Sequence, residues 1–188
     1  MKALLKLSNV MEKAATKKYI LIFMFIMLAV GYMSMNNVTG TARLKEISNG
    51  TGTLDMKYYY NSKDAYSTLN LLGGTGRKFY ANWLAMDFFV SLSTMILHSI
   101  LISFFLKKLD KFKKYGKVNL LPFIRGALDY IENFIIIIML FNYPEEYTVA
   151  ASVAGLVTSL KWILFVICII IILILVLMTV IKSFKSIY

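Results

Sequence analysis

Charged side chains are scarce in this chain. They make up 16% of its 188 residues, whereas a typical soluble domain contains about 25%. Hydrophobic residues reach 59% of the sequence. The composition therefore argues against an ordinary soluble domain and indicates a protein that lies largely within a membrane.

Residues that often carry catalysis or metal binding are also few. The chain has one cysteine, Cys168, and one histidine, His98. A single cysteine cannot form an internal disulfide. The sequence has no H-E-x-x-H motif, no G-x-S-x-G motif and no metal-spaced set of cysteines and histidines. We therefore expect no cofactor and no metal, and an enzyme is not the favoured interpretation.

Basic residues outnumber acidic ones by 21 to 10, which gives a net charge of +11. Most of the lysines lie in residues 2–18, 107–117 and 182–185, beside the ends of apolar stretches. No basic stripe interleaves with exposed aromatic residues, so the pattern argues against nucleic-acid binding. It favours the lipid bilayer as a partner instead.

Four apolar stretches are long enough to cross a bilayer, which takes about 20 helical residues. They cover residues 19–35, 83–106, 120–141 and 149–181. Backbone groups within lipid must be satisfied inside each segment, so we expect helices. The prediction is one all-α membrane domain over residues 1–188, a bundle of four transmembrane helices.

The lysine-rich flanks predict the orientation of this bundle. The loop at 142–147 contains Glu145 and Glu146 and no base. By the positive-inside rule, both termini are expected in the cytoplasm, with the loops at 36–82 and 142–147 outside. The bias toward lysine, isoleucine, asparagine and tyrosine is typical of an AT-rich bacterial genome, so we expect a multi-pass protein of a bacterial plasma membrane.

The first 18 residues form a basic segment with apolar side chains at helical spacing. Two interpretations stay open. One is a surface helix attracted to anionic lipid headgroups. The other is a cytoplasmic flank that only sets the orientation of the first membrane helix.

The long loop at 36–82 predicts a small extracellular cap. Asn49-Gly50 lies between two weakly alternating runs, at 43–47 and 53–58, which favours a β-hairpin. A short helix follows at 63–72, capped by Asn61 or Ser62 and ended by Gly73-Gly74. Aromatic residues gather at the expected outer membrane surface, among them Tyr60, Tyr66 and Tyr80.

Polar residues interrupt the apolar stretches in a regular pattern. Arg125, Asp129, Glu132 and Asn133 follow the i, i+4, i+7, i+8 spacing of one helix face. Each ionisable group at the centre of a membrane helix costs roughly 2.5–3.5 kcal/mol, so this face is expected to look into the protein. The stretch at 83–106 has a similar stripe, formed by Asp87, Ser91, Thr94 and His98.

We call the following residues the polar seam: Asp87, His98, Arg125, Asp129, Glu132, Asn133 and Lys161. Helix lengths place His98 and Asp129 at a similar depth if their helices are neighbours. Two placements of Lys161 stay open. It either lies at the outer interface with Trp162, or lies deep, beside Asp129 and Glu132.

The polar seam has three interpretations. A self-satisfying network would fix helix pairing and register. A path or pocket would mark a small transporter, or a protein that binds lipid or a small molecule, through Asp129, Glu132 and His98. An intramembrane enzyme would use the carboxylates and histidine as acid and base on a lipid. We favour a non-enzymatic membrane protein whose cap and seam serve assembly, either as a homo-oligomer or with a membrane partner.

Several short motifs also form a recognisable series. They are Asp55-Met56-Lys57, Tyr60, Ala65-Tyr66, Leu72-Gly73, Gly76-Arg77, Tyr80 and Asp87, then Leu121-Pro122 and Asp129-x-x-Glu132-Asn133. Over roughly residues 54 to 144 this series resembles an uncharacterised group of small prokaryotic four-helix integral membrane proteins. The resemblance implies no activity, but it adds Asp55 and Arg77 to the candidate cap residues. The order of spans is similar to claudins and tetraspan proteins in topology alone, because the W…C…C loop signature is absent.

Overall fold

The computed structural model describes residues 2–36, 38 and 40–185 of the chain. Within this described part the regular elements are helices, and no strand occurs. The elements are α1 (Lys2–Ala14), α2 (Lys17–Met35), α3 (Thr41–Ile47), α4 (Ser62–Lys108), α5 (Phe112–Tyr115), the 3-10 helix η1 (Gly116–Leu120), α6 (Leu121–Asn142) and α7 (Thr148–Lys185).

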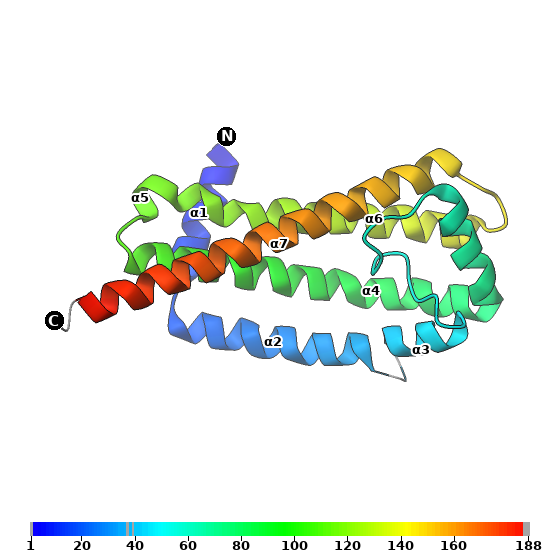
Figure 1. Ribbon diagram of the computed structural model, residues 1–188, viewed down its shortest axis with the longest axis horizontal. Helices are drawn as coiled ribbons and strands as arrows, with labels where there is room; N and C mark the ends of the chain where they lie inside the picture. Colours follow the sequence, from blue (N-terminus) through cyan, green and yellow to red (C-terminus); the bar gives the residue numbers. More distant parts are fainter. Residues whose placement is uncertain (1, 37, 39, 186–188) are drawn as a thin grey trace.

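The long helices run side by side along one axis (Figure 1). α6 packs against α4 and α7, whereas α2 packs against α4. α1, α5 and the end of α7 lie at one end of the molecule, and α3 and the bend of α4 lie at the other (Figure 1). The indole Nε1 of Trp83 donates to the carbonyl of Ser34 at 3.0 Å, which ties the end of α2 to α4.

Among the described residues, three helices are long and apolar enough to cross a membrane: α2, α4 and α7. They contain the predicted spans at 19–35, 83–106 and 149–181. The prediction of a four-helix transmembrane bundle is wrong, because α6 does not qualify. Arg125, Asp129 and Glu132 all fall within its 22 residues, and this density of charge is unlike that of an apolar span. Instead, α6 lies between α4 and α7 and buries its charged face against them.

The β-hairpin prediction is also wrong. Residues 41–47 form the helix α3, and Leu44, fully buried, packs into the core with Ile47 one turn later. Asn49 and Gly50 do have the positive φ angles of a hairpin turn, 52° and 88°. Here they end a helix, and the Gly50 N–H donates back to the carbonyl of Lys45 at 2.8 Å. Asn-Gly serves both purposes, so the motif alone could not separate them.

The predicted short helix at 63–72 forms the first turns of α4. Asn61 and Asp64 cap it reciprocally: the Asn61 side chain accepts from the Asp64 N–H at 2.9 Å, and Asp64 accepts from the Asn61 N–H. Gly73 has the non-helical angles φ 62° and ψ −178°, so the helix that begins at Ser62 ends there, as predicted, and a second helical segment follows after a sharp bend under the same label α4. The cap is therefore the segment from α3 to this bend, folded over the ends of α6 and α7.

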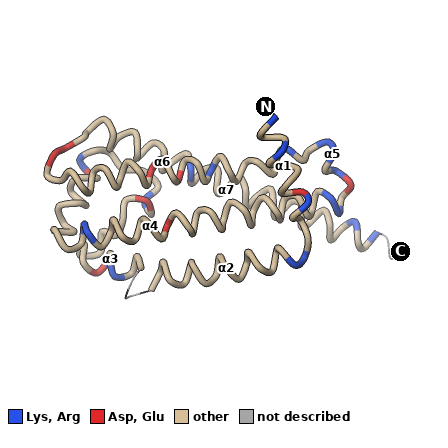
Figure 2. The backbone as a smooth tube through the Cα atoms, turned by 180° about the vertical axis from the view of Figure 1, so that it is seen from behind, with Lys and Arg blue, Asp and Glu red and all other residues tan. Residues whose placement is uncertain are grey.

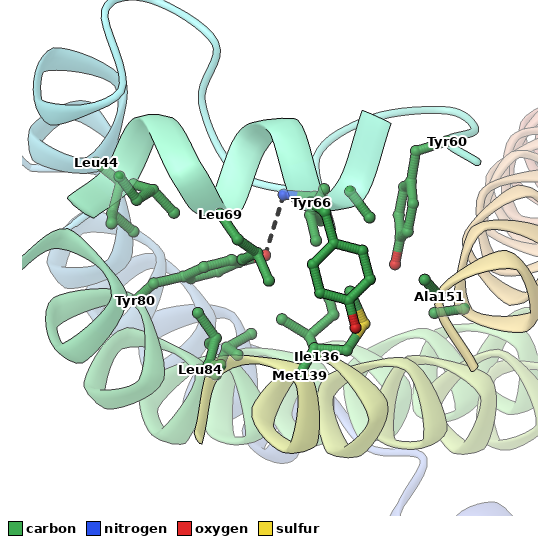
Figure 3. Packing of buried hydrophobic residues seen from close by; sticks show 14 of the residues in the cluster. Leu44, Tyr60, Tyr66, Leu69, Tyr80, Leu84, Ile136, Met139 and Ala151 are labelled. Carbon is green, nitrogen blue, oxygen red and sulfur yellow. Dashed lines mark hydrogen bonds between the residues drawn. The ribbon is translucent and has the colours of Figure 1, made fainter. Parts of the chain in front are cut away.

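One large hydrophobic cluster sits under the cap (Figure 3). It joins Leu44 of α3, Leu69 and Leu84 on the two sides of the α4 bend, and Ile136 and Met139 of α6. A smaller cluster lies at the opposite end, where Met11 and Ala15 pack against Ile100 of α4. The side of α1 that carries Leu7, Met11 and Ala14 is thus covered by the protein itself, whereas Leu4, Leu5, Val10 and the lysines are left exposed.

Candidate functional site

Lys161 of α7 is the centre of the polar seam. Its Nζ lies 2.8 Å from Asp129 Oδ1 and 2.5 Å from Glu132 Oε2. All three side chains are almost completely buried. The sequence left two placements of Lys161 open, at the outer interface or beside Asp129 and Glu132. The structure has the second. A single cation of α7 therefore bridges two carboxylates that lie one turn apart on α6.

Arg125 extends the ion pairs along α6. Its Nη2 lies 3.4 Å from Asp129 Oδ2, and its Nη1 donates to Ser91 Oγ of α4 at 3.4 Å. Asp129 is thus held between two cations from two helices. Ser91 belongs to the predicted polar stripe of the second stretch, and this contact joins that stripe to the charged face of α6.

Asn133 and Thr158 complete the hydrogen bonds between helices. Asn133 Nδ2 donates to Asp87 Oδ2 at 2.8 Å, which joins α6 to α4. Thr158 Oγ1 donates to Glu132 Oε1 at 2.5 Å, which joins α7 to α6. Thr158 was missed by sequence reasoning, although it lies one turn before Lys161 and therefore shares its helix face.

His98 lies apart from this cluster. Its ring faces Phe165 of α7, with the ring centroids 5.8 Å apart. The Arg125 guanidinium lies on the same phenyl ring, 5.6 Å from its centroid. In the described part of the chain no hydrogen bond or ion pair joins His98 to Asp129.

The cap contributes a fourth carboxylate to the buried region. The Tyr80 hydroxyl donates to Asp55 Oδ1 at 2.6 Å and accepts the Leu54 N–H at 3.0 Å, the bond dashed in Figure 3. Burial raises the pKa of the Asp55 carboxyl, and the positive charge of Lys161 opposes that rise. Asp55 and Tyr80, both expected in the cap, therefore lie in the structure as a bonded pair between the cap and the long helices.

The chain just after Asp55 lies directly on α7. The nearest atom to a Cβ placed on Gly155 would be the Tyr60 carbonyl oxygen, at only 1.8 Å. Ser159, one turn later, donates to the Tyr58 carbonyl at 2.8 Å. Figure 3 shows the Tyr60 ring pointing toward Ala151 of the same helix. The backbone of the cap at Tyr58 and Tyr60 thus packs directly against the small residues Gly155 and Ser159 of α7.

The other two cap residues hold the turn between α6 and α7. Tyr66 Oη accepts the Tyr147 N–H at 2.5 Å. Arg77 donates to the Leu69 carbonyl at 3.0 Å, and its guanidinium lies 3.7 Å from the centre of the Tyr143 ring. Neither residue contacts the polar seam, so the predicted cap set divides into two groups with different neighbours.

Replacing Tyr80 with phenylalanine is expected to destabilise the protein by about 1–3 kcal/mol, because it leaves a buried carboxylate oxygen of Asp55 without its donor. The measurement is the thermal unfolding midpoint in detergent. Tyr32→Phe is the matched control, since Tyr32 is 75% exposed on α2 and should show no change. Equal midpoints for both variants would contradict the role assigned to the Tyr80 hydroxyl.

The charges of the buried region do not balance. Asp55, Asp129 and Glu132, which are buried, and Asp87, which is half-buried, supply four carboxylates. The buried Lys161 and the half-buried Arg125 supply two cations. Within the described residues, no group of three or more histidine, cysteine, aspartate and glutamate side chains is placed to hold a metal ion. Five of the hollows on the described surface are lined by residues outside the polar seam.

Comparisons with known proteins give no assignment. No protein-family model matches the chain, and neither the curated proteins nor the solved structures include a significant match. The resemblance to the prokaryotic four-helix group therefore stays a prediction.

Proposed function

We propose that the protein is a non-enzymatic, multi-pass integral membrane protein. The polar seam and the cap hold one arrangement of α4, α6 and α7, and the exposed faces serve assembly with further copies or with a membrane partner. The observation that carries this proposal is the bridge from Lys161 to Asp129 and Glu132. A bridge that joins two helices through buried charges restricts their relative position, as buried polar groups do in helical assemblies.

Two further observations support a structural role for the seam. Asp87 and Asp55, the carboxylates without a cation, are bonded to Asn133 and Tyr80 respectively. Five of the hollows on the described surface lie at the cap, at the α6–α7 turn and at the opposite end of the molecule, and none of these five is lined by a seam residue. A ligand-handling site normally lies in a concave pocket.

The membrane and orientation belong to the same proposal. We place the protein in a bacterial plasma membrane, with the lysine-rich end that contains α1, α5 and the end of α7 in the cytoplasm. The support is the concentration of lysines there: thirteen lie in residues 2–18, 107–117 and 182–185, against four in residues 36–82, which agrees with the positive-inside rule.

A second candidate function is ion or proton handling by the seam. One specific observation favours it: the buried region has two more carboxylates than cations. Intramembrane carboxylates are common on ion and proton paths. The carboxylate pair Asp129 and Glu132 would then bind the transported species, and Lys161 would be displaced from them.

Native mass spectrometry of the gently extracted protein, beside Glu132→Gln, separates the two candidates. Glutamine keeps the shape of the side chain and its bond to Thr158, while it removes one of the two charges that Lys161 bridges. The structural proposal predicts the same oligomer, the same partners and the same bound lipids for both proteins. A small molecule, ion or lipid that the wild type retains and a folded Glu132→Gln loses would overturn it and favour the second candidate.

A further inference from the structure

The whole net charge of the protein resides at one end. Residues 2–18, 107–117 and 182–185 contain thirteen lysines against two acids, Glu12 and Asp110. The eight bases in the rest of the chain are matched by eight acids. Figure 2 shows this concentration of blue at α1, α5 and the end of α7. We call this part of the molecule the basic end.

The basic end coincides with the ends of all three apolar helices. α2 begins at Lys17, α4 ends at Lys108 and α7 ends at Lys185. When these helices lie in a bilayer, the basic end lies at the level of the lipid headgroups. Anionic headgroups attract lysines at that level, and the attraction falls off within a Debye length.

A hollow of about 510 Å³ lies within the basic end, between α1 and the α5–η1 segment. This volume is in the usual range of ligand sites. Its lining residues are Leu5, Ser8, Asn9, Glu12, Phe112, Lys113, Lys114, Gly116 and Lys117. The three lysines form one wall and are exposed, whereas Glu12 is the single acid in the lining.

The walls of the hollow are fixed by buried contacts. Asn119 is fully buried, and its Nδ2 donates to the Ser8 carbonyl of α1 at 3.0 Å and to Ser103 Oγ of α4 at 2.8 Å. On the other side, the Phe112 ring lies directly over Gly116, so that a Cβ on this glycine would come within 2.8 Å of the ring. α1 is therefore anchored to η1 and α4, and the hollow is formed before any ligand enters.

We propose that this hollow binds the phosphate headgroup of an anionic membrane lipid. Lys113, Lys114 and Lys117 supply the positive charge for the phosphate, and Asn9 supplies an amide for its oxygens. The apolar requirement of a lipid is met beside the hollow, since Leu4 and Leu5 of α1 remain partly exposed, at 58% and 37%. A soluble phosphate has no acyl chain that could contact these leucines. The inference rests on the membrane placement proposed above, and not on the role of the polar seam.

The test is a titration of the detergent-solubilised full chain with a short-chain phosphatidylglycerol, followed by native mass spectrometry. Phosphatidylcholine with the same acyl chains is the neutral comparison. The variant is Lys113→Gln/Lys114→Gln/Lys117→Gln. Its matched control, Lys17→Gln/Lys18→Gln/Lys185→Gln, removes three lysines from the same end but leaves the hollow intact. All substituted side chains are exposed, so both variants are expected to fold, and equal thermal midpoints verify this.

The expected result is one tightly bound phosphatidylglycerol, preferred about tenfold or more over phosphatidylcholine and weakened by salt. The preference should disappear in the hollow variant and persist in the control. If both variants lose the preference for phosphatidylglycerol equally, the total charge of the basic end, rather than the hollow, attracts the lipid. That result would overturn the proposal. Competition by inorganic phosphate at the same concentration as the lipid would assign the site to a soluble anion and overturn it too. The single variant Lys114→Gln, with an intermediate affinity, would localise the contact further.

Discussion

Lys161→Met is expected to lower the free energy of unfolding by about 3–5 kcal/mol, the usual cost of breaking a buried ion pair from one side. Methionine fills a similar volume, so the loss comes from charge rather than from a cavity. Asp129 keeps Arg125 at 3.4 Å, but Glu132, which is fully buried, keeps only the Thr158 hydroxyl. A denaturant titration in detergent, followed by tryptophan fluorescence, measures the difference.

Two controls define what this loss means. Lys182→Met breaks an ion pair of similar length, 2.6 Å to Asp110, but on the surface, and should have little effect. The joint replacement Lys161→Met/Asp129→Leu/Glu132→Leu/Arg125→Met removes all four charges and should recover most of the stability. A Lys161→Met protein as stable as Lys182→Met would show that the bridge does not hold α6 and α7 together.

Gly155→Ala is expected to detach the cap from α7 and to cost about 3 kcal/mol, the upper end of the usual range for overpacking. The added methyl carbon would stand 1.8 Å from the Tyr60 carbonyl oxygen. The obstacle is backbone, which cannot turn away as a side chain can, so the segment around Tyr60 must move. Hydrogen exchange followed by mass spectrometry should show faster exchange in residues 51–61 and unchanged exchange in α2.

Gly31→Ala is the matched control for this prediction. Gly31 lies within α2, and a Cβ placed there meets nothing within 4 Å. The same chemical change should therefore leave the cap untouched and stabilise the helix by roughly 0.5–1 kcal/mol. Unchanged exchange at 51–61 in a folded Gly155→Ala protein would contradict the close approach of Tyr60 to α7.

The main helices and the charged face of residues 120–141 could be predicted because local rules decide them. The spacing of Arg125, Asp129 and Glu132 on one helix face follows from 3.6 residues per turn, and the structure buries this face against its neighbours. The need of two buried carboxylates for a cation was one argument for a deep Lys161, but the sequence left the outer interface open as well, and only the structure places Lys161 beside Asp129 and Glu132. The helix cap expected at Asn61 or Ser62 is made by Asn61, because helix capping depends on residues close together in the sequence.

What could not be predicted depends on contacts between distant parts of the chain. α3 is a helix because Leu44 and Ile47 meet the core at α4, and no local pattern records that surface. Asp55 joins the buried region only because the Tyr80 hydroxyl, 25 residues away, reaches it. The predicted number of transmembrane helices is wrong for a different reason. Residues 120–141 are long enough to cross a bilayer, but the three charges within them are unlike an apolar span.

The bridge at Lys161 also has a consequence for the order in which the protein is made. Asp129 and Glu132 leave the ribosome before Lys161, because their helix precedes it by about thirty residues. Until α7 is synthesised, Arg125 is the only cation on α6, and it contacts Asp129 alone of the two acids. The ion pair of Glu132 with Lys161 can therefore form only after α7 has been synthesised. The final packing of α6 against α7 depends on this last helix.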